Sequence, residues 1–126
     1  MHNAGGVFVI SVAARLVAMH PNTLRKYERQ GFLEPARTNG NLRRYSRADI
    51  ARLRQIKHLV EDRGINLAGV ELALDLTERI RCLRDDVRTY ENHLDKKNSN
   101  EDHSMLRRRL DDQVRALLEI LGAERA

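Results

Sequence analysis

The sequence contains one cysteine, no tryptophan, few other aromatic residues and no long apolar run. Because a single thiol cannot form an internal disulfide or a multi-thiolate metal site, we expect Cys82 to be an inert packing residue of a helix, with a redox sensor as the alternative. No apolar stretch approaches the roughly 20 residues that a membrane-spanning helix needs. The scarcity of aromatic side chains predicts an aliphatic core, which is typical of helical proteins.

A secretion signal is also missing from the start of the sequence. Residues 1–6 carry no charged leader, and the apolar stretch over residues 7–10 is far too short for a signal peptide. We therefore expect the protein to stay in the cytoplasm.

Constellations for catalysis or cofactor binding are absent as well. The acids of the pairs at residues 85–86 and 111–112 are adjacent on expected helices, so the two carboxylates of each pair diverge. The histidines lack metal-ligand spacing, and no glycine-rich phosphate loop is present. We therefore predict that the protein is not an enzyme and has no catalytic residues, no cofactor and no bound metal.

Positive charge is concentrated in the first half of the chain. Residues 1–64 contain 12 basic and 5 acidic side chains, whereas residues 65–126 contain 11 basic and 13 acidic ones. This division predicts a polyanion-binding domain joined to a tail with another role. Since no membrane segment accompanies the basic half, nucleic acid is the better candidate for its partner.

Two short helices separated by a tight turn are predicted within the basic half. An apolar stretch that could form a strand precedes a first helix over residues 12–18, with Ser11 as its N-cap. Pro21 is favoured at the first position of a second helix, which makes His20 the N-cap. Two helices joined in this way form a helix-turn-helix motif.

A β-hairpin is predicted directly after the second helix, which ends near Gln30. Asn39-Gly40, a strong signal of a hairpin turn, lies between residues 32–33 and residues 42–45. A hairpin at this place makes the motif a winged helix-turn-helix.

Two further helices follow the hairpin. Ser46 and Asp49 have the spacing of a capping box at the start of the third helix, and Gly64 ends that helix. Asn66 can cap a fourth helix. The buried stripe of the third helix is predicted to be Ile50, Leu53, Ile56 and Val60.

An apolar seam begins at residue 76 with alternating spacings of four and three residues, which is the period of a coiled coil. So short a chain has little globular mass to cover this seam, and we expect a second subunit to do so. An internal helical pair within one monomer is the alternative. The predicted dimerisation residues are Leu76, Ile80, Leu83, Val87, Tyr90 and Leu94. After a polar interruption over residues 96–104, the pattern resumes at Leu106, Leu110, Val114, Leu117 and Leu121.

We therefore predict a mainly α fold with two parts. A winged helix-turn-helix DNA-binding domain with a small β-hairpin wing spans residues 1–75. A coiled-coil dimerisation helix and a C-terminal helical tail span residues 76–126. A two-fold symmetric dimer would read a palindromic site.

The second helix presents Asn22, Arg25, Lys26 and Arg29 on one face, because these residues recur at helical spacing. In the major groove, arginine can bridge guanine and asparagine can bridge adenine. A solvated helix surface is the alternative, but the preceding turn and the following wing favour DNA.

The predicted wing carries guanidinium groups that suit phosphate oxygens, although simple solubility is their alternative role. Tyr27 and Tyr45 either contact phosphate or are core aromatics with the hydroxyl at the surface. The full set of predicted DNA-binding residues is His20, Asn22, Thr23, Arg25, Lys26, Tyr27, Arg29, Arg37, Asn41, Arg43, Arg44, Tyr45 and Arg63.

Several of these stretches resemble the MerR family of regulators. The similarity to the first two helices of that family is carried by ISVAARL at residues 10–16 and MHPNTLRKYERQGFL at residues 19–33. Within the family, the chain is similar to the HspR-type heat-shock repressors. That similarity is carried by HP at residues 20–21, TLR at 23–25, RT at 37–38, GN at 40–41, RRYS at 43–46 and GINLAG at 64–69.

The resemblance implies a winged helix-turn-helix domain and an antiparallel coiled coil that joins two subunits. It implies repression of a chaperone operon through an inverted-repeat operator at the bacterial nucleoid, with the DnaK chaperone as co-repressor and RNA polymerase as a further candidate partner. A MerR-type activator that responds to a small ligand and a coiled-coil protein that docks a chaperone are the alternatives.

Residue by residue, the resemblance implies two kinds of DNA contact. Asn22, Thr23, Arg25 and Lys26 would face the groove, and Tyr27, Arg37, Arg43 and Tyr45 would face the DNA backbone. Arg63 would reach phosphate as part of a second wing. The chain departs from the family pattern at Ala18, where a glycine is usual, and at Asn22, where a glutamine is common.

Overall fold

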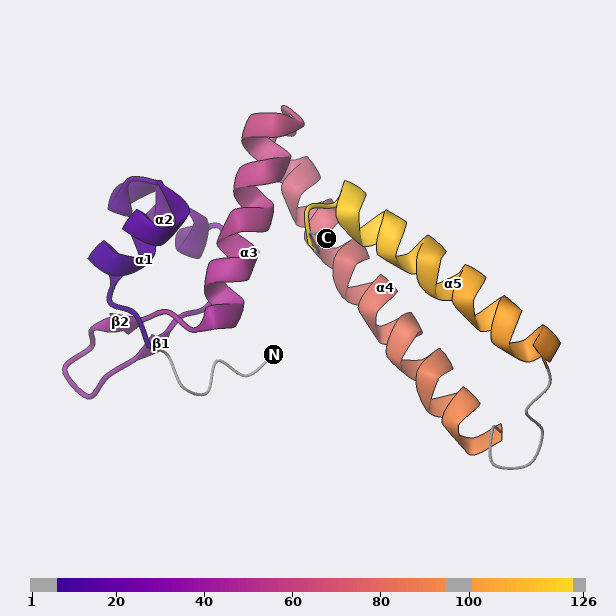
Figure 1. The fold of residues 1–126 in the computed structure, drawn as a ribbon. Coiled ribbons are helices and arrows are strands. Elements are labelled where there is room, and N and C mark those ends of the chain that lie inside the picture. Colours follow the sequence, from indigo (N-terminus) through magenta and orange to yellow (C-terminus); the bar gives the residue numbers. More distant parts are fainter. Residues whose placement is uncertain (1–6, 95–100, 124–126) are drawn as a thin grey trace. The chain divides into compact units, whose positions relative to one another are not determined.

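The computed structural model describes residues 7–94 and 101–123, with the backbone alone for residues 93–94 and 101–103. The chain divides into two compact units, Met1–Asn66 and Leu67–Ala126, which we call the N-terminal and C-terminal units. In chain order the elements are α1 (Ile10–Val17), α2 (Pro21–Arg29), β1 (Ala36–Arg37), β2 (Arg43–Arg44), α3 (Arg47–Lys57), the π-helix η1 (His58–Asp62), α4 (Leu67–Leu94) and α5 (Glu101–Ile120) (Figure 1). The mainly helical fold with a small hairpin agrees with the prediction.

Helix α1 begins two residues earlier than predicted. Val9, not Ser11, is its N-cap, and no side chain caps the helix. The backbone carbonyl of Val9 instead accepts hydrogen bonds from the N–H groups of Val12 and Ala13. The strand predicted over residues 7–10 is reduced to a single antiparallel bridge between Phe8 and Tyr45, because the chain enters the helix before a ladder can form.

A left-handed residue joins α1 to α2. Ala18 has φ 54° and ψ 48°, and its N–H donates to the carbonyl of Arg15. The Lys57 ammonium, from α3, donates to the carbonyls of Val17 and Ala18 over 3.1 and 3.4 Å. Cationic donors at a helix C-terminus satisfy carbonyls that have no partner in the helix. The turn is therefore fastened to α3.

The start of α2 is the one that Pro21 predicts. Pro21 occupies the first helical position, and Nδ1 of His20 accepts a hydrogen bond from the N–H of Asn22 over 3.0 Å. The helix ends at Arg29, where Gly31 adopts φ +80°. These local features confirm the predicted helix-turn-helix.

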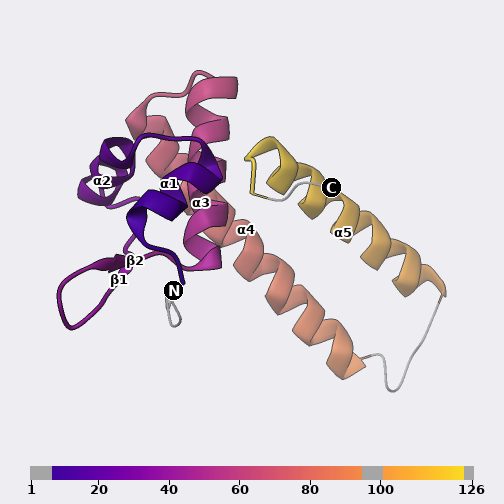
Figure 2. The same ribbon diagram turned by 60° about the vertical axis from the view of Figure 1, so that its left-hand side comes forward.

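The hairpin has the predicted place but a different turn. Strands β1 and β2 pair antiparallel, with Ala36 opposite Arg44 and Arg37 opposite Arg43. The left-handed residue of the loop is Asn41, at φ 65°. Residues 39–41 form a three-residue loop closed by a hydrogen bond from Thr38 N–H to the carbonyl of residue 42, so the turn is not the two-residue type that Asn-Gly favours. Its tip projects from the helices of the N-terminal unit in both views (Figures 1 and 2).

Helix α3 carries the predicted capping box. Ser46 Oγ accepts from the N–H of Asp49 over 3.0 Å, and the Asp49 carboxylate accepts from the N–H of Ser46 over 2.9 Å. Ile50, Leu53 and Ile56 are buried as predicted. The helix continues into η1, in which Val60 is only partly buried. The other buried apolar side chains of the N-terminal unit are Ala13, Ala14, Val17, Leu24, Tyr27, Phe32, Leu33, Tyr45 and Leu59.

The predicted fourth helix and the predicted coiled-coil helix are one continuous helix, α4. No proline or glycine follows Gly69 before the end of this helix, so nothing in the sequence stops it. The two compact units divide between residues 66 and 67, and the domain boundary at residues 75–76 stays a prediction.

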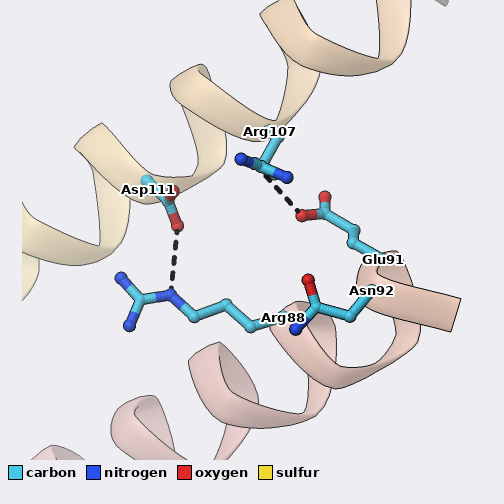
Figure 3. A pocket seen from close by; sticks show the side chains of 5 residues that line it. All are labelled: Arg88, Glu91, Asn92, Arg107 and Asp111. Carbon is cyan, nitrogen blue, oxygen red and sulfur yellow. Dashed lines mark ion pairs between the residues drawn. The ribbon is translucent and has the colours of Figure 1, made fainter. Parts of the chain in front are cut away.

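Within the C-terminal unit, α5 lies along α4 (Figures 1 and 2). Among residues 104–120 of α5, Val114 and Leu118 are the buried side chains. Farther along the pair, charged residues line the space between the helices. Arg88 lies 3.9 Å from Asp111 and Arg107 lies 3.6 Å from Glu91 (Figure 3). Two ion pairs therefore join the helices in this part of the pair.

The predicted coiled-coil seam is largely uncovered within this chain. Leu76, Leu83 and Tyr90 are 47%, 56% and 66% exposed, whereas Ile80 and Val87 are partly buried. The side chain of Leu94 and the interruption at residues 95–100 lie outside the described residues, as do side chains 101–103. Among the described residues, no helix combines the length and the apolar character needed to cross a membrane.

Replacing Ala18 by glycine should raise the free energy of unfolding by about 0.5 to 1 kcal/mol, measured by urea denaturation. The left-handed conformation costs an L-residue about 1 to 2 kcal/mol, and glycine avoids this cost. The greater backbone freedom of glycine in the unfolded chain offsets part of the resulting gain in stability. Ala51, exposed in the middle of α3, is the matched control. Its replacement by glycine should lower stability by about 1 kcal/mol. Equal destabilisation by both changes would contradict strain at Ala18.

Candidate nucleic-acid interface

Helix α2 has two distinct faces. Leu24 and Tyr27 are 0% and 6% exposed and pack into the core of the N-terminal unit. Asn22, Lys26 and Arg29 are exposed on the opposite side, and Arg25 is partly exposed beside them. We call Asn22, Arg25, Lys26 and Arg29 the basic face of α2. Its hydrogen-bonding side chains match the donors and acceptors of a major groove.

Two members of the basic face bind each other. Nη1 of Arg25 donates to Oδ1 of Asn22 over 2.8 Å, one helical turn apart. The amide oxygen thus orients the guanidinium of Arg25 before any ligand arrives. Asparagine at this position is one of the two departures from the family pattern, and its short side chain reaches the guanidinium within the same helix.

The ends of α2 place other predicted residues. His20 is exposed, but its Nδ1 already caps the helix, so only the other ring nitrogen is left for a ligand. Thr23 is partly buried in the first turn. Arg63 is exposed after η1, and its N–H donates to the carbonyl of His58.

The wing is attached to α2 through Glu28, a residue that we did not predict to belong to the site. Its Oε1 lies 2.8 Å from Nη2 of Arg37, and its Oε2 lies 2.5 Å from Nε of Arg43. Nη1 of Arg37 also donates to the carbonyl of Asn41 over 3.2 Å. Both ends of the Arg37 guanidinium are therefore engaged within the protein. The only sign of this attachment in the sequence is that Glu28 is a single acid on a basic helix that is followed by the arginines of the wing.

The wing residues differ in how accessible they are. Arg43 uses its Nε for Glu28, and its side chain is 27% exposed. Arg44 is partly buried beside it on β2, and Asn41 is exposed at the turn. The structure therefore brings Arg37, Arg43 and Asn41 together on the hairpin.

Tyr45 does not have the exposure that a phosphate contact requires. The residue is 0% exposed, and its hydroxyl is enclosed with no hydrogen-bond partner among the described residues. Burial raises the pKa of the Tyr45 phenol, the Glu28 carboxylate adds to the rise, and the Arg43 and Arg25 guanidinium groups oppose it. Of the two roles that the sequence left open for Tyr45, the structure therefore supports the core role, because the side chain is fully buried.

Tyr27 is also a core residue. Its ring centroid lies 5.9 Å from that of Phe32, and burial, followed by the charge of Glu61, raises the pKa of the Tyr27 phenol. Of the two roles that the sequence left open for this residue, the structure supports the core role.

The comparisons with known proteins agree with this geometry. The model of the MerR helix-turn-helix family of regulatory proteins matches residues 8–77, more than half of the chain.

This chain belongs to the MerR family.

Three relatives show how far the similarity extends. The chain is 51% identical over 78 residues to the heat shock protein HspR of Streptomyces coelicolor, covering 62% of this chain and 52% of that protein. It is 35% identical over 72 residues to the regulator GlnR of Bacillus cereus, covering 57% and 55%. It is 38% identical over 69 residues to the regulator MlrA of Escherichia coli, covering 54% and 28%. The chain thus spans about half the length of HspR and GlnR, and the HspR-type resemblance is confirmed.

The described residues do not form a cluster of potential metal ligands. No group of three or more His, Cys, Asp or Glu side chains among the described residues is arranged to hold a metal ion. Cys82, which we expected to pack inside a helix, lies in α4 but is exposed.

Replacing Tyr45 by phenylalanine should raise the free energy of unfolding by about 1 kcal/mol, because it removes a buried hydroxyl that has no partner. Urea denaturation measures this change. The same variant should bind DNA with the same salt dependence as the original chain. A loss of about one unit in the slope of log affinity against log salt would instead support a phosphate contact.

Proposed function

We propose that this chain is a sequence-specific DNA-binding repressor of heat-shock and chaperone genes that acts as a dimer on an inverted-repeat operator. The observation that carries the proposal is the basic face of α2, with the wing fixed beside it by Glu28. The regulated genes are proposed from the 51% identity to HspR, which covers this same domain. A protein of this function would work in the cytoplasm at the nucleoid.

The arrangement divides DNA binding between two kinds of contact. Asn22 and Arg25 are placed to read base edges, and Arg25 is already oriented by the amide of Asn22. Lys26, Arg29 and the free nitrogens of Arg43 supply positive charge for phosphates. Phosphate contacts would set the register of the helix, and base contacts would give the sequence preference.

Replacing Arg25 by alanine should weaken binding to the chain's own upstream DNA by about 1 to 3 kcal/mol at about 150 mM salt, if Arg25 reads a base. Binding to random duplex should change much less. Gel shifts on both DNAs measure the two affinities. Arg79, exposed on α4 and in no ion pair among the described residues, gives a control variant that loses the same charge. If the unmodified chain shows no preference over random duplex, the proposed function is wrong.

The uncovered seam supports dimerisation through α4. Leu76, Leu83 and Tyr90 are one or two heptads apart, so they lie on one face of the helix. Helix α5, which lies along α4, does not bury them, since all three are about half exposed or more. An apolar face of this length favours a second copy of the chain over solvent. The two copies would then present two α2 helices to the two halves of a palindrome.

Replacing Leu83 by glutamate should convert the dimer to a monomer, because a charge would enter the apolar seam. Sedimentation equilibrium measures the mass. Operator affinity should fall about a hundredfold or more as two-site binding becomes one-site binding. Glutamate in place of Thr89, which is exposed off the seam, should leave the dimer intact. An Leu83→Glu chain that keeps its mass and its helix content would contradict this interface.

The proposed co-repressor is the DnaK chaperone, and its support is the resemblance to HspR-type repressors. A footprint on the upstream DNA, with and without purified DnaK, tests this proposal. We expect DnaK to extend the protection or to lower the protein concentration that gives it. Identical footprints would remove DnaK from the proposal, and operator binding would be unaffected. RNA polymerase is a further proposed partner.

A further inference from the structure

We propose that Glu28 is a positioning residue that fixes the wing relative to α2, so that the preference for operator over other DNA depends on it. This inference rests on the proposed function, because it assigns a role in sequence-specific binding. Glu28 itself would not touch the DNA.

The geometry is a single carboxylate bound to both strands of the hairpin. Arg37 on β1 and Arg43 on β2 are directly opposite each other in the antiparallel register. Each binds a different oxygen of Glu28, at 2.8 and 2.5 Å. We call this directly opposed pair, Arg37 and Arg43, the rung of the hairpin. Because one carboxylate binds both members of the pair, it holds β1 and β2 together beside α2.

We call the contacts of Glu28 with Arg37 and Arg43 the tie; through Arg37, these contacts extend to the tip of the wing. Arg37 uses its second terminal nitrogen to bind the carbonyl of Asn41, the left-handed residue of the loop. The path therefore runs from Glu28 on the helix, through Arg37, to the turn of the hairpin. A change at Glu28 would release Arg37 and Arg43 from α2 and so leave the wing without this connection to the helix.

A hairpin this short needs such an external support. Its strands contain two residues each, and an isolated two-stranded hairpin is at best marginally stable. The Phe8–Tyr45 bridge holds the chain just after β2. Glu28 is the connection that the structure describes between the rung itself and the basic helix, and its side chain is only 18% exposed. Charge-assisted hydrogen bonds in such partly buried surroundings are stronger than exposed ion pairs.

The same cluster includes a residue of the basic face. Glu28, Arg43 and Arg25 all lie close enough to the buried Tyr45 to act on it electrostatically. Arg25, which is placed to read bases, and Arg43, which is placed for phosphate, therefore share one neighbourhood with the carboxylate. If Glu28 holds Arg43 in place, the distance between the base contact of Arg25 and the phosphate contact of Arg43 is held constant.

Loss of the carboxylate would have opposite effects on the two kinds of binding. Two arginines would lose their shared counter-charge and become free to bind any phosphate, which strengthens binding to arbitrary DNA. The wing and α2 would no longer be held in register, which weakens binding to the operator. A residue that only stabilised the fold would instead lower both affinities together.

The first test replaces Glu28 by glutamine and measures dissociation constants for the upstream operator and for random duplex. We expect the ratio of the two constants to fall about tenfold, the scale of losing a charge-assisted hydrogen bond. Binding to random duplex should stay equal or become tighter. Glu71→Gln removes the same charge from an exposed position on α4 and should leave the ratio unchanged. An unchanged ratio in Glu28→Gln would overturn the inference.

The second test uses Arg37→Gln, which stands by itself even if Glu28→Gln fails to fold, and adds the double variant to compare the losses. Since both ends of Arg37 bind protein groups, Arg37→Gln should weaken operator binding without changing the salt slope. On the operator, the loss in the double variant should be smaller than the sum of the two single losses, because both changes break the Glu28–Arg37 contact. Additive losses, or a slope lowered by about one unit, would show that Arg37 contacts phosphate directly and would overturn the inference.

Failure of the proposed function has a different signature. In that case the unmodified chain itself would not distinguish operator from random duplex, and the inference would fall with it. If the unmodified chain discriminates and Glu28→Gln discriminates equally well, only the role of Glu28 is lost.

Discussion

The left-handed turn at Ala18 sets the direction in which α2 leaves α1, and the rest of the N-terminal unit depends on it. The turn is held from outside by Lys57, which binds the last carbonyls of α1. With this angle fixed, Leu24 is buried, whereas Asn22 and Lys26 remain in solvent. A helix that buries one stripe in this way exposes the opposite one.

The polar contacts of the interface have two different tasks. The Asn22–Arg25 bond lies on the basic face and orients a side chain that the proposed function uses. The ion pairs of Glu28 lie between elements and hold the wing in place. Arginines with the same charge are thus divided between binding and support. Their roles follow from their partners rather than from their residue type.

Helix α4 uses its faces for different neighbours. Charged residues such as Arg88 and Glu91 meet α5 through ion pairs, whereas the apolar seam at Leu83 and Tyr90 remains exposed. Ionic contacts near a surface contribute little stability each, and burial of large apolar side chains contributes much more. Covering the exposed apolar seam would therefore contribute more stability than further ion pairs, and for this reason we propose that a second chain covers it.

The sequence by itself determined the local features. The cap at His20, the capping box at Ser46 and the place of the hairpin depend on residues within about four positions of one another, where backbone geometry leaves few choices. Tertiary structure alone decided that Glu28 binds arginines nine and fifteen residues away, that Tyr45 is enclosed, and that Arg88 of α4 pairs with Asp111 of α5. These outcomes depend on how separate elements pack, and no periodicity along a single helix records that packing.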